Sequence, residues 1–192
     1  MRTFLAIPLT DDVKLILTEV QKQLRRSISH GVTWVDPSLS HITVKFLGDI
    51  EEGSIPDLVA GLKKVTRTTK VFNIQCGGLG CFPNIHQPRV IWLGVKREPL
   101  LSDLHAQIDN SLSVTGLPKD EKNFSPHLTL GRVKENLTIS ELVTLTSMIK
   151  TEAEKPLIEM PVREVILYKS VLSRTGPVYT QISVFGLGAE QK

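Results

Sequence analysis

Two short His-x-Thr patterns are the residues of this sequence best suited to chemistry. His41 and Thr43 open the run HITVKFLG, and His127 and Thr129 open the run HLTLGRV. Both runs have the composition of a β-strand, in which residues i and i+2 point to the same face. Each predicted strand therefore presents an imidazole and a hydroxyl together on one face and apolar side chains on the other.

Two imidazoles and two hydroxyls suit the cleavage of a phosphodiester. One neutral imidazole takes a proton from water as it attacks phosphorus, and a protonated imidazole donates to the leaving oxygen. The ordinary histidine pKa of about 6.5 lets both forms coexist near neutral pH. The hydroxyls of Thr43 and Thr129 can donate hydrogen bonds to the non-bridging oxygens, where charge accumulates in the transition state. This chemistry needs no metal, and we expect neither a metal nor a cofactor.

A single His-x-Thr pattern is weak evidence, because a histidine at the end of a strand often has only a structural role. Two copies, each backed by an apolar face, favour a function. The histidines are far apart in the sequence, so the fold has to bring them together.

The elements that position these patterns follow from apolar periodicity and turn residues. We predict strands at residues 2–8, 32–35, 41–48, 71–76, 89–95, 127–133, 162–172 and 178–184. We predict a helix over residues 10–27 and further helices starting near Ser54, Pro99 and Thr138. Thr138 has Glu141 three residues on, which is a capping-box pattern. Glycines 77, 78 and 80 are expected to form a turn, as are residues 175–177.

The order of these elements predicts the fold class. Each half of the chain carries strands, helices and one His-x-Thr strand, which suggests an internal duplication. Several connections are too short for parallel crossovers, so we expect antiparallel sheets with helices packed against them. We expect residues 1–192 to form a single domain.

Composition narrows the class of protein. Of 192 residues, 41% are hydrophobic and 22% are charged, an ordinary globular balance that allows a core without disulfides. The net charge of +3 fits a phosphate-bearing ligand but is too small for a protein that wraps nucleic acid. We see no export signal and no membrane span, so we expect a cytoplasmic protein with free thiols at Cys76 and Cys81. The spacing of these cysteines with His86 does not fit a zinc site.

The two runs resemble the paired motifs of the two-histidine (2H) phosphoesterase superfamily, and within it the RNA 2′,3′-cyclic phosphodiesterase branch, also called 2′-5′ RNA ligase. The resemblance extends to the opening RTFLAI, to residues 89–95 and to residues 170–179. It implies an α+β, bilobal fold in which two antiparallel sheets form a central cleft, with helices on the outer faces and a pseudo-two-fold duplication.

The resemblance also implies an activity and site residues. The activity is metal-independent hydrolysis of 2′,3′-cyclic phosphate ends of RNA or nucleotides to a 2′-phosphate. His41 would be the acid for the 3′-oxygen and His127 the base for water. Arg132 stands where the family carries an arginine that contacts phosphate. Strict alternation would place Arg132 on the face opposite His127, unless a bulge or the strand end brings it round.

Other candidates have a structural alternative. By alternation, Phe46 faces the core, and Lys45 shares the face of His41, either near the phosphate or as a solvated edge lysine. Phe4 and Trp34 fit base stacking, although lone aromatic residues more often belong to the core.

Three function classes stay open. The first is the cyclic phosphodiesterase. The second keeps the site and changes the substrate or direction, to a 2′-5′ RNA ligase or to hydrolysis of ADP-ribose 1″,2″-cyclic phosphate. The third is a non-catalytic module that binds RNA ends. We expect a monomer whose partners are RNA ends or nucleotides bearing 2′,3′-cyclic phosphate, without membrane association.

Overall fold

The computed structural model describes residues 1–174 and 176–188, in which strands predominate and four α-helices are interspersed among them. The strands are β1 (Arg2–Pro8), β2 (Val32–Trp34), β3 (His41–Asp49), β4 (Phe72–Phe82), β5 (Val90–Val95), β6 (His127–Val133), β7 (Ile158–Val162), β8 (Glu164–Ser173) and β9 (Gly176–Gly186). The helices are α1 (Asp11–Ser27), α2 (Ile55–Thr68), α3 (Pro99–Ser113) and α4 (Ile139–Ala153), with short 3₁₀ turns η1 (Pro37–Leu39) and η2 (Glu52–Ser54).

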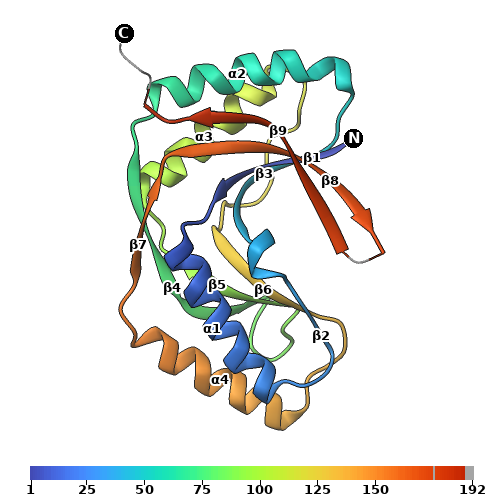
Figure 1. The fold of residues 1–192 in the computed structure, drawn as a ribbon, viewed down its shortest axis with the longest axis vertical. Helices are drawn as coiled ribbons and strands as arrows, with labels where there is room; N and C mark the ends of the chain where they lie inside the picture. Colours follow the sequence, from blue (N-terminus) through green and yellow to red (C-terminus); the bar gives the residue numbers. More distant parts are fainter. Residues whose placement is uncertain (175, 189–192) are drawn as a thin grey trace.

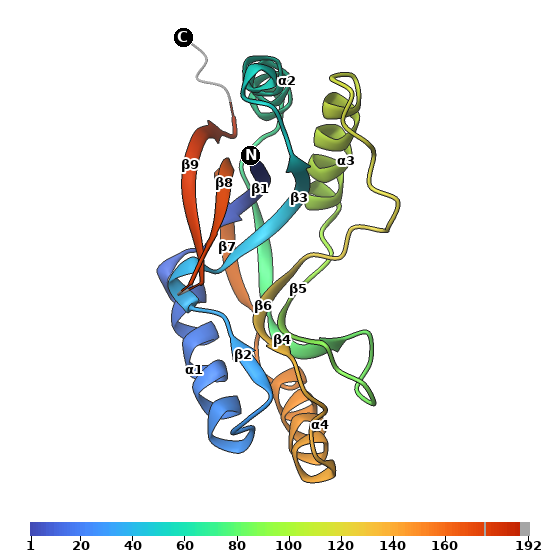
Figure 2. The same cartoon turned by 90° about the vertical axis from the view of Figure 1, so that its right-hand side faces the viewer.

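The strands form two antiparallel sheets (Figure 1). The first sheet has the order β3-β1-β8-β9 and the second has the order β2-β6-β5-β4-β7. Helices α2 and α3 contact each other and lie against the first sheet, whereas α1 and α4 contact each other on the second (Figures 1 and 2). In the described part of the chain, helices therefore cover the outer face of each sheet and leave its inner face free of helices, as the α+β prediction expects.

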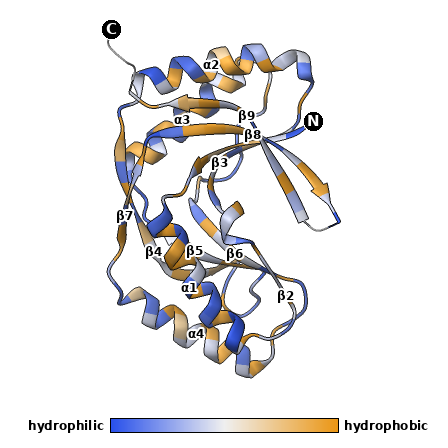
Figure 3. Cartoon of the chain, viewed as in Figure 1, coloured by the Kyte–Doolittle hydropathy of each residue, from blue (hydrophilic) through white to orange (hydrophobic). Residues whose placement is uncertain are grey.

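The helices are amphipathic for the reasons that the sequence indicates. In α1 the side chains of Val13, Leu17 and Leu24 are buried at helical spacing. Helix α4 begins with the predicted capping box, in which Thr138 and Glu141 exchange hydrogen bonds. Figure 3 shows hydrophilic and hydrophobic residues alternating along α1 and α4, as expected of helices that bury one side. Among the described helices, none combines the length and the hydrophobicity that crossing a bilayer requires.

The predicted duplication is present in the topology. In one half β1 leads through α1 to β3 and then α2, and in the other β5 leads through α3 to β6 and then α4. Helix α1 follows a strand of the first sheet but covers the second, and α3 follows a strand of the second sheet but covers the first. The halves are therefore interlocked, and their buried residues form one hydrophobic cluster.

One predicted turn is wrong. Gly77, Gly78 and Gly80 lie within β4. The register of β4 against β5 shifts between Cys76 and Leu79, and Gly77 and Gly78 have positive φ values of 148° and 73° there. A Cβ at Gly80 would lie 2.2 Å from the ring of Trp92, so only glycine lets that ring cross the strand.

Two predictions near the C-terminus need correction or lie outside the described residues. The strand predicted at residues 162–172 is two strands, the end of β7 and most of β8. Thr175, part of the predicted turn, lies outside the described residues.

Candidate active site

His41 and His127 occupy matching places at the start of β3 and β6. The Nδ1 atom of His41 lies 2.8 Å from the carbonyl oxygen of Leu39, and the Nδ1 atom of His127 lies 2.8 Å from that of Ser125. A carbonyl oxygen only accepts hydrogen bonds, so each Nδ1 carries a proton and donates it. This fixes the tautomer of both neutral rings and leaves each Nε2 available to a substrate.

The two threonines share the faces of their histidines. Thr43 and Thr129 are half-buried, and the residues before them, Ile42 and Leu128, are fully buried in the core. Strands β3 and β6 also contact each other where the two sheets meet. The fold therefore brings both His-x-Thr strands to one place, although they belong to different sheets.

Both His-x-Thr strands contain an irregularity three residues after the histidine. Opposite β1, residue Val44 has no partner, because Thr43 pairs with Ala6 and Lys45 pairs with Leu5. Opposite β5, residue Leu130 is skipped in the same way. A bulge of one residue inverts the alternation of the side chains that follow it, in β3 as far as a second register shift at Leu47.

The bulges determine to which face of the sheet the side chains after them point. Arg132 is exposed and returns to the face of His127, as the bulge alternative predicted. The prediction for Phe46 is wrong: its side chain is 64% exposed, and its ring lies near Phe4 on the face of His41. The prediction for Lys45 is also wrong, because Lys45 is 3% exposed and points to the helix-covered side.

A buried side chain holds the second bulge in place. The amide Nε2 of Gln21 on α1 donates to the carbonyl oxygens of Leu130, at 2.9 Å, and Val35, at 2.6 Å. Beside the bulge, a Cβ at Gly131 would lie 2.8 Å from the ring of Trp34. Trp34 therefore packs over Gly131, with the Arg25 guanidinium 5.7 Å from its ring centroid, in agreement with a packing role.

Aromatic side chains surround His41. The Phe4 ring stacks on the imidazole with centroids 4.8 Å apart, and Tyr179 meets it edge-on at 5.4 Å. Tyr168 stacks on the ring of Phe4 at 5.3 Å. Burial lowers the pKa of His41 below its ordinary value, although the hydrogen bond to Leu39 opposes this. Phe4 itself is buried, so it supports the histidine rather than offering a free face to a base.

A second aromatic group flanks His127. Phe82 meets the imidazole edge-on at 5.1 Å and lies 5.1 Å from the ring of Trp92. No pattern in the sequence identified Phe82, since it belongs to a strand distant from His127 along the chain.

Tyr179 links the two sheets electrostatically. Burial raises the pKa of its hydroxyl, whereas the positive charges of Arg132 and Arg2 lower it. Arg132 comes from the second sheet, and Tyr179 lies against His41 in the first. The site therefore combines residues of both halves of the chain.

Comparison with known proteins identifies the family. The family model described as the 2′-5′ RNA ligase superfamily matches residues 16–174. The chain belongs to the 2′-5′ RNA ligase superfamily. This is the two-histidine family that the motifs resemble.

Relatives within the superfamily match almost the whole chain. A protein of Methanothermobacter thermautotrophicus named RNA 2′,3′-cyclic phosphodiesterase is 34% identical, over 97% of this chain and 99% of the relative. A protein of the same name from Archaeoglobus fulgidus is 35% identical, over 96% of this chain and 99% of the relative.

Solved structures of superfamily proteins share the fold. A protein of Thermus thermophilus superimposes with a TM-score of 0.79 at 29% identity, covering 100% of both chains. LigT of E. coli in its apo form superimposes with a TM-score of 0.74 at 21% identity, covering 98% of each chain. The arrangement of two sheets and four helices is thus one that other proteins adopt.

The cysteines of this superfamily member are free thiols. Cys76 is buried, and burial raises its pKa to about 12, so it is a poor nucleophile. Within residues 1–174 and 176–188, no group of three or more His, Cys, Asp or Glu side chains is arranged to hold a metal ion.

Proposed function

We propose that this protein hydrolyses 2′,3′-cyclic phosphate ends of RNA or nucleotides to a 2′-phosphate, with His41 and His127 as its acid–base pair. The observation that carries the proposal is the twin geometry of the two rings. Each donates from Nδ1 to a carbonyl two residues earlier, and each keeps Nε2 available on strands that contact each other. Membership of the superfamily, with relatives named RNA 2′,3′-cyclic phosphodiesterase, supports the substrate class.

The reaction follows from this geometry. Neutral His127 accepts a proton at Nε2 from a water molecule whose oxygen bonds to phosphorus. The bond between phosphorus and the 3′-oxygen breaks, and protonated His41 gives its Nε2 proton to that oxygen. The products are a 2′-phosphate and a free 3′-hydroxyl. General acid–base help of this kind contributes about 10²–10⁴-fold to the rate.

The environment of His41 suits a group that becomes protonated when an anionic substrate binds. In the free protein, burial lowers the pKa of His41 and favours the neutral ring. An anionic phosphate placed beside the ring favours the imidazolium. The bound substrate therefore prepares the acid that the reaction consumes.

Thr43, Thr129 and Arg132 complete the proposed site. The two hydroxyls and the guanidinium can donate hydrogen bonds to the non-bridging oxygens of the phosphate, where negative charge grows as water adds. The bulge at Leu130 is what makes Arg132 available for this role, because it returns the side chain to the face of His127.

Product analysis tests the proposal. We expect the purified protein to convert 2′,3′-cyclic nucleotides and RNA ends to 2′-phosphates, identified by ³¹P NMR, with unchanged rates in a chelator. A 3′-phosphate product, loss of activity in the chelator, or binding of phosphate-ended RNA without turnover would contradict it. Including ADP-ribose 1″,2″-cyclic phosphate and 2′-5′ linked oligonucleotides in the substrate panel, compared by kcat/KM, separates the alternative substrates.

We also propose that residues 1–192 act as one domain and as a monomer in the cytoplasm. The interlocked halves support a single domain, and the site is assembled from one chain, so it needs no second copy. The free cysteines fit a reducing compartment. Light scattering coupled to size exclusion tests the monomer, and a dimer mass would contradict it.

A further inference from the structure

A buried lysine lies four residues after His41. The Nζ atom of Lys45 lies 2.6 Å from Asp109 Oδ1, 2.8 Å from Asp120 Oδ1 and 3.1 Å from the carbonyl oxygen of Pro118. An ammonium group has three protons to donate, so these acceptors satisfy it fully. The bulge at Val44 turns Lys45 inward to meet them.

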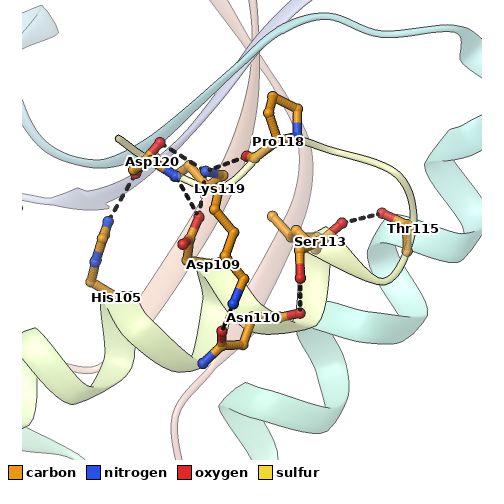
Figure 4. A network of polar contacts seen from close by, with 10 residues as sticks. His105, Asp109, Asn110, Ser113, Thr115, Pro118, Lys119 and Asp120 are labelled. Atoms are coloured by element: carbon orange, nitrogen blue, oxygen red, sulfur yellow. Dashed lines mark hydrogen bonds and ion pairs between the residues drawn. The ribbon is translucent and has the colours of Figure 1, made fainter. Parts of the chain in front are cut away.

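The residues that accept hydrogen bonds from Lys45 lie in the part of the chain that precedes His127. Asp109 is on α3, and Pro118 and Asp120 belong to the loop between α3 and β6. Figure 4 shows Asp109, Pro118 and Asp120 together beside His105. Lys45 therefore connects the strand of His41 to the segment that precedes His127.

Further contacts carry this connection along the loop. The Oδ2 atom of Asp120 lies 2.9 Å from His105 Nε2, and its backbone N–H donates to Asp109 Oδ1 at 3.2 Å. The His105 ring stacks on Phe124, with centroids 4.2 Å apart and planes 7° apart. Phe124 directly precedes Ser125, whose carbonyl oxygen accepts the Nδ1–H of His127.

The energetics of the cluster point to a role other than stability. Burial lowers the pKa of Lys45, but the hydrogen bonds and charges of Asp109 and Asp120 outweigh it, so the pKa lies above its ordinary value and the ammonium stays charged. Buried ion pairs are often no more stabilising than apolar residues of the same volume, because each charge gives up its hydration. Their geometry, in contrast, is specific, which suits a structure that has to hold two segments at a fixed distance.

We propose that Lys45, Asp109, Asp120 and His105 form a positioning network that sets the placement of the His127 imidazole relative to His41. The network acts through the loop and the Ser125 carbonyl, and none of its members touches the substrate. The proposal rests on the proposed function, since the placement matters for catalysis only if both rings act on one phosphate.

Asp120 gives the cleanest test, because its side chain is 33% exposed and its loss leaves Lys45 paired with Asp109. We expect Asp120→Ala to lower kcat for a 2′,3′-cyclic nucleotide by about 10-fold to 10²-fold with little change in KM, since small misplacements of reacting groups have effects of this size. Asp120→Asn, which keeps an oxygen for Lys45, should recover part of the loss. Asp103→Asn, an exposed carboxylate on α3, is the matched control and should leave kcat unchanged.

Rates are measured well below the melting temperature of each variant, so that a loss of stability does not lower the folded fraction. A kcat for Asp120→Ala within twofold of the wild-type value would overturn the proposal, even if its Tm falls. Lys45→Met extends the test, with a larger expected loss of kcat.

An NMR measurement separates failure of this inference from failure of the proposed function. The Nδ1–H signal of His127 reports its hydrogen bond to Ser125 without any substrate. We expect Asp120→Ala to shift or broaden it and to leave the ring signals of His86 unchanged. An unaltered His127 signal would overturn the network whatever the activity. An inactive wild type with the expected shift would overturn the function alone.

Discussion

The ring of Phe4 stacks on the imidazole of His41, with centroids 4.8 Å apart and planes 26° apart. Together with the edge of Tyr179, it removes one face of the imidazole from water. The hydrogen bond from Nδ1 to the Leu39 carbonyl oxygen keeps the imidazole from flipping about the bond that joins it to Cβ. His41 is thus held in one orientation and one tautomer before any substrate arrives.

Burial against Phe4 predicts the titration of His41. We expect an NMR titration of the free protein to give a midpoint for His41 below 6.5, the ordinary value. Phe4→Ala should move the midpoint upward, because water then reaches the ring. A wild-type midpoint at or above 6.5 would contradict the burial account.

The same shift predicts a dependence of stability on pH. Above pH 6.5 the ring is neutral in both states, and the contribution of His41 is fully present. As the pH falls from 6.5 through the lower folded pKa, the unfolded chain binds a proton that the folded protein excludes, so this stability is lost. The free energy of unfolding in urea should fall more between pH 7 and pH 5 for the wild type than for His41→Gln. Equal declines would exclude the linkage.

The nearness of Arg132 to Tyr179 predicts a second titration. The charge of Arg132 lowers the pKa of Tyr179, so Arg132→Gln should raise it. The chain has two tyrosines, and a Tyr168→Phe background leaves Tyr179 alone in an absorbance titration. Arg97→Gln, an exposed arginine elsewhere, is the control and should have no effect. An unchanged Tyr179 pKa in Arg132→Gln would place the guanidinium away from this site.

The hydroxyls of Thr43 and Thr129 are predicted to stabilise the transition state. Replacing either with valine keeps the shape and removes the donor, which should lower kcat by about 10²-fold. Serine at either position should retain most of the activity. Thr180→Val, at an exposed position of β9, provides the control. Valine variants that stay within threefold of the wild-type kcat would remove the threonines from the mechanism.

Local sequence patterns predicted most of the elements because periodicity and capping are local properties. The helix over α1 and the capping box of Thr138 are examples, and so are the two strands that begin with His41 and His127. The same patterns show that each threonine shares the face of its histidine, since the two are only two positions apart.

The side chains beyond each His-x-Thr pattern could not be placed from the strand itself. The bulges at Val44 and Leu130 depend on how many residues of β1 and β5 lie opposite, which no local pattern records. The bulge at Val44 exchanges the faces of Lys45 and Phe46 relative to strict alternation, and the bulge at Leu130 changes the face of Arg132. The aromatic residues around the imidazoles were also missed, because they reach the site from strands that are distant along the chain.

The assignment of acid and base predicts a response to the leaving group. A 4-nitrophenyl phosphodiester releases a nitrophenolate anion, which is stable without a proton. The rate of its hydrolysis therefore depends little on the general acid His41. We expect His41→Ala to lose less than about 10-fold on such a substrate and about 10²–10⁴-fold on a 2′,3′-cyclic nucleotide. His127→Ala should lose activity on both. If His127→Ala instead retained activity on the 4-nitrophenyl substrate and His41→Ala did not, His127 would be the acid and His41 the base.

The central claim is that two imidazoles cleave one phosphodiester, and kcat of the single-histidine variants on a 2′,3′-cyclic nucleotide tests it most directly. We predict that His41→Ala and His127→Ala each lower kcat by about 10²–10⁴-fold while both variants keep the wild-type fold by circular dichroism. His86→Ala, at an exposed histidine, should match the wild type. Wild-type turnover in either active-site variant would contradict the two-histidine mechanism.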